Sequence, residues 1–149
     1  MTYEDLVKAR IIEPYEVGNE EIAAKIRDAR HDIDVAQNMA GMDLDWAFSI
    51  AYNGIREVAT AYAYHLGYRP KGNAKHYNTF KFLEEALPDS FQKEVSLMQR
   101  LRKKRNQVVY DSRGIISETE AKEIIAFSKK FLDEILDILP KDITRLTRK

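Results

Sequence analysis

The sequence contains no cysteine. Disulfide bonds, thiol catalysis and cysteine-ligated zinc are therefore excluded, and a reducing compartment is the natural setting for such a chain. No apolar run approaches membrane-spanning length, and residues 1–10 lack the apolar core of a signal peptide. We therefore expect a cytoplasmic protein without a membrane segment.

The chain also lacks an excess of either charge, since 24 basic side chains balance 24 acidic ones. Domains that bind nucleic acid over their whole surface usually carry a clear positive excess, so the balance argues against that class and leaves room for a local basic patch. At 149 residues, with 44% hydrophobic and 32% charged side chains, the composition is that of an ordinary globular domain with a sizeable core.

Residues that interrupt helices are few, with six glycines and four prolines, and no run of alternating β-branched residues indicates a strand. We predict an all-α fold: an antiparallel, up-and-down bundle of four to five helices, preceded by a short N-terminal helix. Residues 1–18 are predicted to form that helix and a linker, residues 19–140 the bundle, and residues 141–149 a basic, frayed tail.

Capping residues indicate where the helices begin, and glycine or proline indicates where they end. Thr2 with Asp5 predicts a first helix to about residue 12, and Ser117 with Glu120 predicts the last long helix, to about residue 139. Further helices are predicted at about 19–40, 44–66, 75–87 and from 89 onward, and the predicted caps are Asn19, Asp43 and Asp89. Residues 68–73 are predicted to form a polar loop.

The helix predicted at 44–66 is apolar almost all round, beginning with Trp46. Such a helix is usually the central and most buried one of a bundle. Asn53, Arg56 and Glu57 stand out as its polar residues, and they are candidates for neutralising a charge that enters the core from another helix.

Arg105 is such a charge. It lies on the inward stripe of the following long helix, whose members are Phe91, Val95, Met98, Leu101, Arg105 and Val108. A buried guanidinium is costly unless an anionic or polar group meets it. Three partners remain open: an acid of the same chain, a second subunit, or a phosphate. Glu57, with Asn53 beside it, is the leading internal candidate.

The cations beside Arg105 lie off this stripe. Arg100, Arg102, Lys103 and Lys104 are interpreted first as a solvated face that complements the helix dipole, and second as a ligand patch. Arg102 is retained as a candidate ligand-binding residue.

Asn106 and Tyr110 follow Arg105, and both are also explained by capping of the helix end and a half-buried aromatic ring. On an unbroken α-helix Tyr110 would lie about 140° round the axis from Arg105. One groove therefore holds all three only if it is wide, if the helix unwinds near Val108, or if two subunits supply its walls.

Arg105-Asn106, three further residues and Tyr110 resemble the Arg-Asn-x-x-x-His signature of HEPN domains. The order of the flanking features is also similar to that family. They are an Ala29-Arg30 pair, the Ala- and aromatic-rich residues 45–68, the segment from Gly67 to His76, and SETEAKEI at 117–124. The resemblance extends over about residues 20–139.

The resemblance implies a helical bundle that forms a homodimer, with paired signature helices lining a shared cleft. Many members are metal-independent ribonucleases, often toxins or defence proteins. In those, the arginine would hold a phosphate and the histidine would act as acid or base, which suits the guanidinium fork and the near-neutral titration of imidazole.

Tyr110 stands where the family has its histidine. A phenol titrates near pH 10, so it donates a hydrogen bond and is a poor base at neutral pH. We therefore predict binding rather than catalysis: of RNA, a nucleotide or a partner protein, at a dimeric cleft, in a stress, defence or toxin–antitoxin setting. One alternative is a metal-independent endoribonuclease with Tyr110 or His76 as a surrogate acid. Another is a structural partner of a nucleotidyltransferase.

The three histidines are His31, His65 and His76, and none has metal-binding spacing. We predict no metal and no cofactor. His31 and His65 are interpreted as surface or helix-terminal residues. His76 falls where the family often has histidine, and we expect a structural hydrogen bond there as well as a place in the ligand-binding site.

Overall fold

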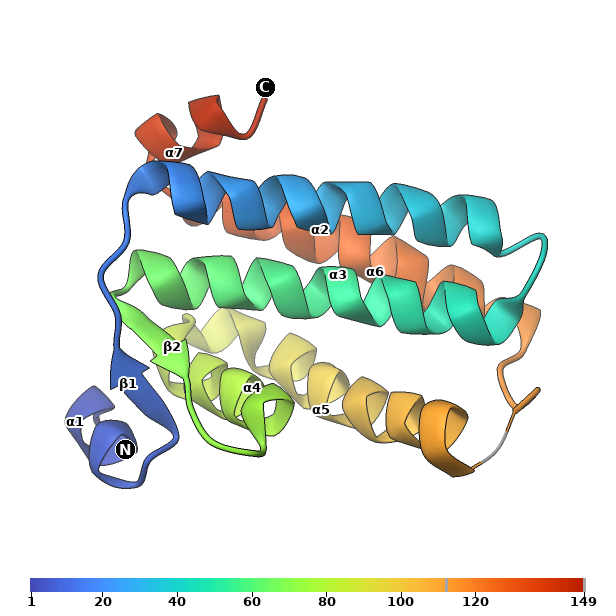
Figure 1. Ribbon diagram of the computed structural model, residues 1–149, viewed down its shortest axis with the longest axis horizontal. Helices are drawn as coiled ribbons and strands as arrows, with labels where there is room; N and C mark the ends of the chain where they lie inside the picture. The colour runs from blue at the N-terminus through green and yellow to red at the C-terminus, as the bar shows by residue number, and fades with distance from the viewer. Residues whose placement is uncertain (112, 149) are drawn as a thin grey trace.

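Helices make up most of the computed structural model, which describes residues 1–111 and 113–148. The elements, drawn in Figure 1, are α1 (Tyr3–Lys8), β1 (Ile12–Pro14), α2 (Asn19–Met39), α3 (Leu44–His65), β2 (Tyr68–Pro70), α4 (Lys75–Ala86), a 3-10 turn (Asp89–Phe91), α5 (Gln92–Asn106), a π-turn (Gln107–Asp111), α6 (Glu118–Ile138) and α7 (Lys141–Leu146). The predicted helical bundle is confirmed.

The third helix, α3, is central, as predicted. It runs antiparallel to α2, and α6, α4 and α5 also pack against it (Figure 1). Gly54 lets α2 approach closely, since a Cβ atom there would lie 3.0 Å from Cγ1 of Ile33. Trp46 is the exception to the predicted burial, with 53% of its surface exposed, because the first turn of α3 extends to the end of the bundle.

The predicted caps are confirmed at three helices and wrong at two. Asp43 accepts a hydrogen bond from the backbone N–H of Trp46, and α1 and α6 begin with the predicted capping boxes. Asn19 is instead the first helical residue of α2, because the extended Gly18 takes the cap position. Asp89 begins the 3-10 turn after Pro88, and no side chain caps that turn.

A two-stranded antiparallel sheet, β1 with β2, corrects the prediction of a helix to residue 12 and a loop at 68–73. The chain leaves α1 through Arg10, whose φ of 60° is left-handed, and Ile12 then pairs with Pro70. Each strand has three residues, which is too short for an alternating pattern to be visible in the sequence.

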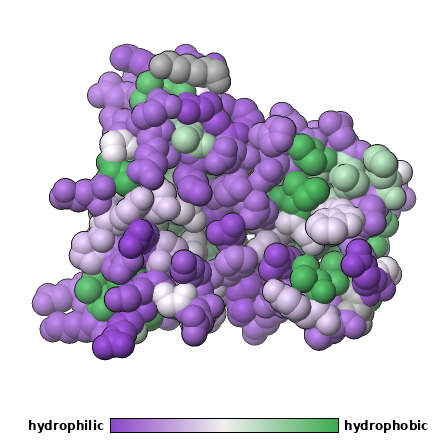
Figure 2. Space-filling view, in the orientation of Figure 1, coloured by the Kyte–Doolittle hydropathy of each residue, from purple (hydrophilic) through white to green (hydrophobic). Residues whose placement is uncertain are grey.

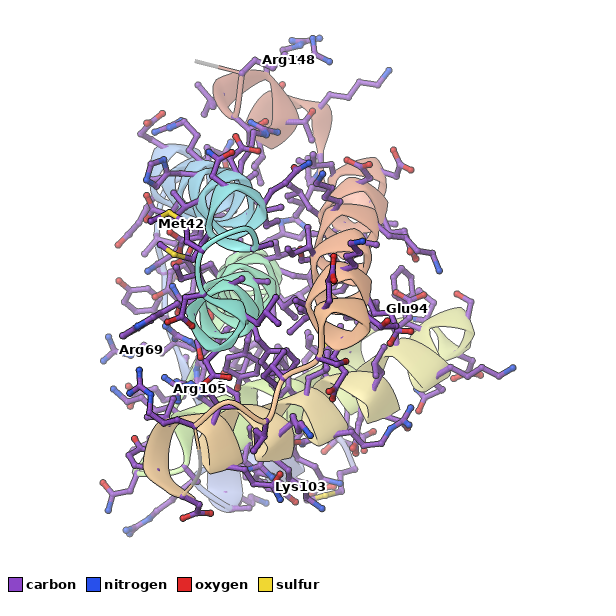
Figure 3. All side chains as sticks on the ribbon, turned by 90° about the vertical axis from the view of Figure 1, so that its right-hand side faces the viewer. Met42, Arg69, Glu94, Lys103, Arg105 and Arg148 are labelled. Atoms are coloured by element: carbon purple, nitrogen blue, oxygen red, sulfur yellow. The ribbon has the colours of Figure 1, made fainter. Side chains whose placement is uncertain are left out.

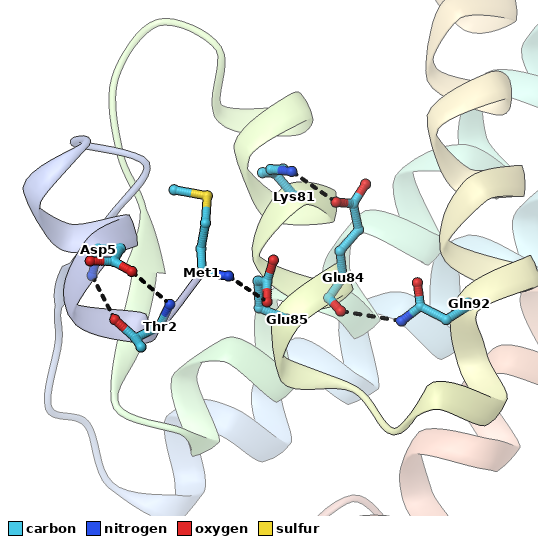
Figure 4. A network of polar contacts seen from close by, with 7 residues as sticks. All are labelled: Met1, Thr2, Asp5, Lys81, Glu84, Glu85 and Gln92. Atoms are coloured by element: carbon cyan, nitrogen blue, oxygen red, sulfur yellow. Dashed lines mark hydrogen bonds and ion pairs between the residues drawn. The ribbon is translucent and has the colours of Figure 1, made fainter.

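Helix α1, the short N-terminal helix predicted from the sequence, packs on α4. Leu6 and Phe82 are almost fully buried in one cluster between them. Figure 4 shows polar contacts on both sides of α4: the amine of Met1 lies 3.4 Å from Oε2 of Glu85, and on the other side Gln92 donates to the backbone carbonyl of Glu84.

The prediction of a frayed C-terminal tail is wrong, because residues 141–146 form α7, which packs on α2. Ile143 is 1% exposed and anchors the helix. The guanidinium groups of Arg27 and Arg30 donate to the backbone carbonyls of Leu146 and Thr147, at 2.7 and 2.6 Å. Within the described residues, no helix has both the length and the apolar character that a membrane crossing requires.

Candidate functional site

A cavity of about 600 Å³ lies between the beginning of α4 and the end of α5. One wall consists of residues 72–77, which lead into α4, and the other comes from α5 and the π-turn. The structure brings together on these walls the predicted ligand-binding residues Arg102, Arg105, Asn106 and His76, and the catalytic candidate Tyr110. Asn53 and Glu57, the predicted internal partners, are not among the lining residues.

The π-turn explains how Arg105 and Tyr110 share one cavity. The α-helical pattern ends at Asn106, and residues 107–111 continue as a π-turn. Bonding from residue i to i+5 brings side chains five positions apart closer to one face than an α-helix does. Val108, 4% exposed, ties the turn to the core. The condition that the helix unwinds near Val108 is therefore met within one chain.

Arg105 points from α5 toward α3, as Figure 3 shows. Its Cζ atom lies 5.7 Å from the centroid of the Tyr52 ring, so the cation faces the electron-rich ring rather than an acid. Its Nε atom is buried and has no hydrogen-bond partner among the described residues. The predicted pairing of Arg105 with Glu57 is not found there.

Glu57 belongs to a separate polar cluster on α2 and α3. Nδ2 of Asn53 donates to Glu57 and to Asp32, at 2.8 Å each, and Arg56 donates to Oδ1 of Asn53 at 2.9 Å. Burial and the neighbouring carboxylate of Asp32 raise the pKa of Glu57 to about 8. Because Glu57 is neutral at pH 7 in this cluster, it supplies no counter-charge to Arg105.

His76 makes the expected structural hydrogen bond. Its Nδ1 atom lies 3.1 Å from the hydroxyl of Tyr52, and the imidazole also lines the cavity. Burial, followed by the charges of Arg56, Arg105 and Arg102, lowers the pKa of His76 to about 4. The imidazole is therefore neutral at pH 7 and has no proton to give as a general acid.

The cavity is positively charged. Lys75, Arg102 and Arg105 line it, no acidic side chain does so among the described residues, and none of these three cations takes part in an ion pair found there. Arg102 is held by Tyr77, whose ring centroid lies 5.3 Å from its Cζ atom, and by a hydrogen bond to Gln99. The site thus presents three cations, of which Arg102 and Arg105 are positioned by aromatic rings, and no counter-ion for them is found among the described residues.

The start of α4 adds to the positive electrostatic potential of the cavity. No side chain caps the helix at Ala74, and residues 74–77 line the cavity. The first N–H groups of a helix and the positive end of its dipole favour an anion. Lys75 and Tyr77 also line the cavity, and neither was predicted as a site residue from the sequence. Their signal was their position beside His76 at the start of a helix that lacks a capping side chain.

Residues 22–139 match the family model of the HEPN domain. The chain belongs to the HEPN domain family. The resemblance found in the sequence is thereby confirmed, and the matched range contains every predicted site residue. Helices α1 and α7 of this HEPN domain lie outside that range. A comparison with curated proteins finds no match.

The chemistry open to this HEPN domain follows from its lining residues. Two guanidinium groups and an ammonium group can hold phosphate oxygens, and the exposed hydroxyl of Tyr110 can donate a hydrogen bond. In the described part of the chain, no group of three or more His, Cys, Asp or Glu side chains is placed to hold a metal ion. The geometry suits recognition of a phosphate.

Proposed function

We propose that this HEPN domain binds single-stranded RNA at the cavity between α4 and α5. The observation that carries the proposal is the convergence of Lys75, Arg102 and Arg105 on a cavity with no acidic lining residue among those described. A phosphate would meet charge-assisted hydrogen bonds there in place of absent counter-ions.

Exposed aromatic rings favour RNA over an isolated phosphate or a partner protein. Tyr77 is 43% exposed and Tyr110 is 75% exposed, and both line the same cavity as the cations. Unpaired bases stack on such rings, and stacking contributes about 1–3 kcal/mol per base. Cations flanked by two exposed rings therefore suit a strand whose bases are not paired.

Binding without cleavage is the role that the acid–base groups support. Tyr110 supplies a phenol where an imidazole would be needed, and His76 is neutral at pH 7 because its pKa is lowered to about 4. The endoribonuclease alternative then depends on Tyr110 as the acid. It requires cleavage of RNA that persists in EDTA and disappears in Arg105→Ala.

We also propose that the domain is a homodimer. Trp46 and Val109 line one small cavity, and Met42 and Tyr110 lie close to them along the chain. We call these four residues the end patch, and they are 44% to 83% exposed. Figure 2 shows hydrophobic side chains gathered at the end of the molecule where α2 gives way to α3. Because Tyr110 belongs to both the end patch and the cavity, a second copy docked there would extend the RNA-binding surface.

The setting in stress, defence or a toxin–antitoxin pair rests on the family resemblance. The alternative role, as structural partner of a nucleotidyltransferase, would use the end patch to bind a different protein. It gains support if the isolated chain is monomeric and binds no RNA.

Titration of a short fluorescent single-stranded RNA tests the binding proposal. We expect Arg105→Ala and Arg102→Ala to weaken binding roughly tenfold or more each, as expected for loss of a charged hydrogen bond. Lys103→Ala is the matched control, because Lys103 is an exposed cation of α5 that points away from the bundle (Figure 3). Equal effects of Lys103→Ala and Arg105→Ala, or no binding by the wild type, would refute the proposal.

A further inference from the structure

Asp45, in the first turn of α3, is a charged residue that is only 8% exposed. Its Oδ2 atom accepts a hydrogen bond of 2.7 Å from the backbone N–H of Gly114, a residue far along the chain. Its Oδ1 atom is buried and has no partner among the described residues. Asp45 therefore joins the beginning of α3 to the chain that follows the π-turn.

This arrangement is poorly suited to a purely stabilising role. A buried carboxylate whose Oδ1 atom finds no partner in the described part of the chain costs free energy there, and a neutral amide would accept the same hydrogen bond from Gly114 at lower cost. Gly114 also has a φ of 75°, a left-handed conformation that side chains other than glycine disfavour. The contact therefore costs desolvation of the Asp45 carboxylate, and it uses a backbone conformation at position 114 that glycine adopts without strain.

The contact holds the far end of the π-turn. Gly114 follows Asp111 by three residues, which span at most about 10 Å, so fixing Gly114 limits where Asp111 can lie. The near side is held by Val108, which is buried. Asp45, Val108 and Val109 line a small cavity of about 70 Å³, which places the start of α3 directly against the turn.

Tyr110 lies between these two anchors. It is 75% exposed, so packing of its own side chain contributes little to its position. Its place beside Arg105 and Asn106 in the cavity depends on the backbone of the π-turn. We propose that Asp45 is a positioning residue of the candidate RNA site: by holding Gly114, it keeps the π-turn in the conformation that presents Tyr110 to the cavity.

Fluorine NMR of protein labelled with fluorotyrosine tests this without any ligand, the Tyr110 signal being assigned from its loss in Tyr110→Phe. We expect Asp45→Ala to shift or broaden that signal and Asp45→Asn to restore it, because the amide oxygen still accepts from Gly114. Gly114→Ala approaches the same contact from the other side. A Cβ atom there would meet nothing within 4 Å, so its effect would come from backbone strain alone.

A second experiment measures RNA binding and therefore rests on the proposed function. We expect Asp45→Ala and Tyr110→Ala to weaken RNA binding by similar factors and the double variant to be no weaker, while Asp45→Ala combined with Arg105→Ala is additive. An unchanged Tyr110 signal in both Asp45→Ala and Gly114→Ala would overturn the positioning role. A shifted signal in a protein that binds no RNA would support it and refute the proposed function.

Discussion

Arg105 of α5 lies over the ring of Tyr52 of α3, with its Cζ atom 5.7 Å from the ring centroid. The hydroxyl of the same tyrosine contacts Nδ1 of His76 at 3.1 Å. The cation that seemed misplaced in an apolar stripe is therefore accommodated by an aromatic face, which attracts it without neutralising its charge. The positive charge remains available to a ligand.

Arg105→Ala should change the free energy of unfolding by less than about 1 kcal/mol. The cation–π contact that is lost is worth about 0.5–1 kcal/mol, and removing the buried Nε atom, which has no partner, offsets part of it. Chemical denaturation measures the change. A buried ion pair with Glu57 would instead cost about 3–5 kcal/mol on removal of one partner, so a loss of that size would contradict the geometry described here.

The sequence predicted the members of the site better than the way they come together. Arg105, Asn106 and Tyr110 were recognisable from their types and order, but the π-turn was not, because Gln107, Val108 and Val109 read as a continuing helix. The turn depends on contacts with distant residues, such as that between Asp45 and Gly114. The spacing of residues within one helix cannot predict contacts between residues far apart in the sequence.

The errors in the fold have the same origin. Trp46 was predicted to be buried because α3 is apolar on every side, and periodicity then gives no direction to distinguish core from surface. Helix α7 was predicted to fray because its basic residues are conspicuous. Its stability depends on Ile143 and on carbonyl contacts made by Arg27 and Arg30 of α2, over a hundred residues earlier.

Glu57 should make the protein less stable as pH rises. Its pKa is raised to about 8 in the fold, above the ordinary value of 4.5, so the folded state binds the proton more tightly. Its contribution is complete below about pH 4.5 and is lost as pH rises through 8. Glu57→Gln should flatten this part of the stability curve and be more stable than wild type at pH 8.

Unfolding curves between pH 5 and pH 9 measure the effect of Glu57→Gln. Asp34→Asn is the control, since Asp34 is an exposed acid of the same helix as Asp32. Parallel curves for wild type and Glu57→Gln would show that Glu57 is ionised in the fold and would contradict its assignment as the protonated member of the cluster.

His76 should make the protein less stable as pH falls, which is the opposite of the effect of Glu57. Its pKa is lowered from 6.5 to about 4 in the fold, so the unfolded chain binds the proton more tightly. The contribution of His76 is complete above about pH 6.5 and is lost as pH falls through 4. His76→Asn should lose less stability than wild type over that interval. His31→Asn, on the exposed surface of α2, should follow the wild-type curve.

RNA binding would shift the protonation equilibrium of His76, since a phosphate near the imidazole favours its charged form. The affinity of wild type for RNA should therefore rise as pH falls from 7 toward 5, and His76→Asn should show a smaller rise. Fluorescence titrations at fixed ionic strength measure both. An affinity that falls on acidification in wild type would contradict the placement of the phosphate beside His76.

The end patch predicts a dimer that depends on Trp46. This side chain is 53% exposed and lines one small cavity with Val109, and a large exposed aromatic ring beside other apolar side chains is typical of the centre of an interface. We expect wild type to be dimeric at micromolar concentration by light scattering, and Trp46→Glu to be monomeric with an unchanged circular dichroism spectrum, because burying an unpaired carboxylate at the interface is costly. Ile138→Ser is the control, since Ile138 is 39% exposed at the far end of α6.

If the dimer also extends the RNA site through Tyr110, Trp46→Glu should weaken RNA binding, whereas Ile138→Ser should not. A monomeric wild type, or a Trp46→Glu protein that stays dimeric, would show that the end patch does not join two copies of this chain.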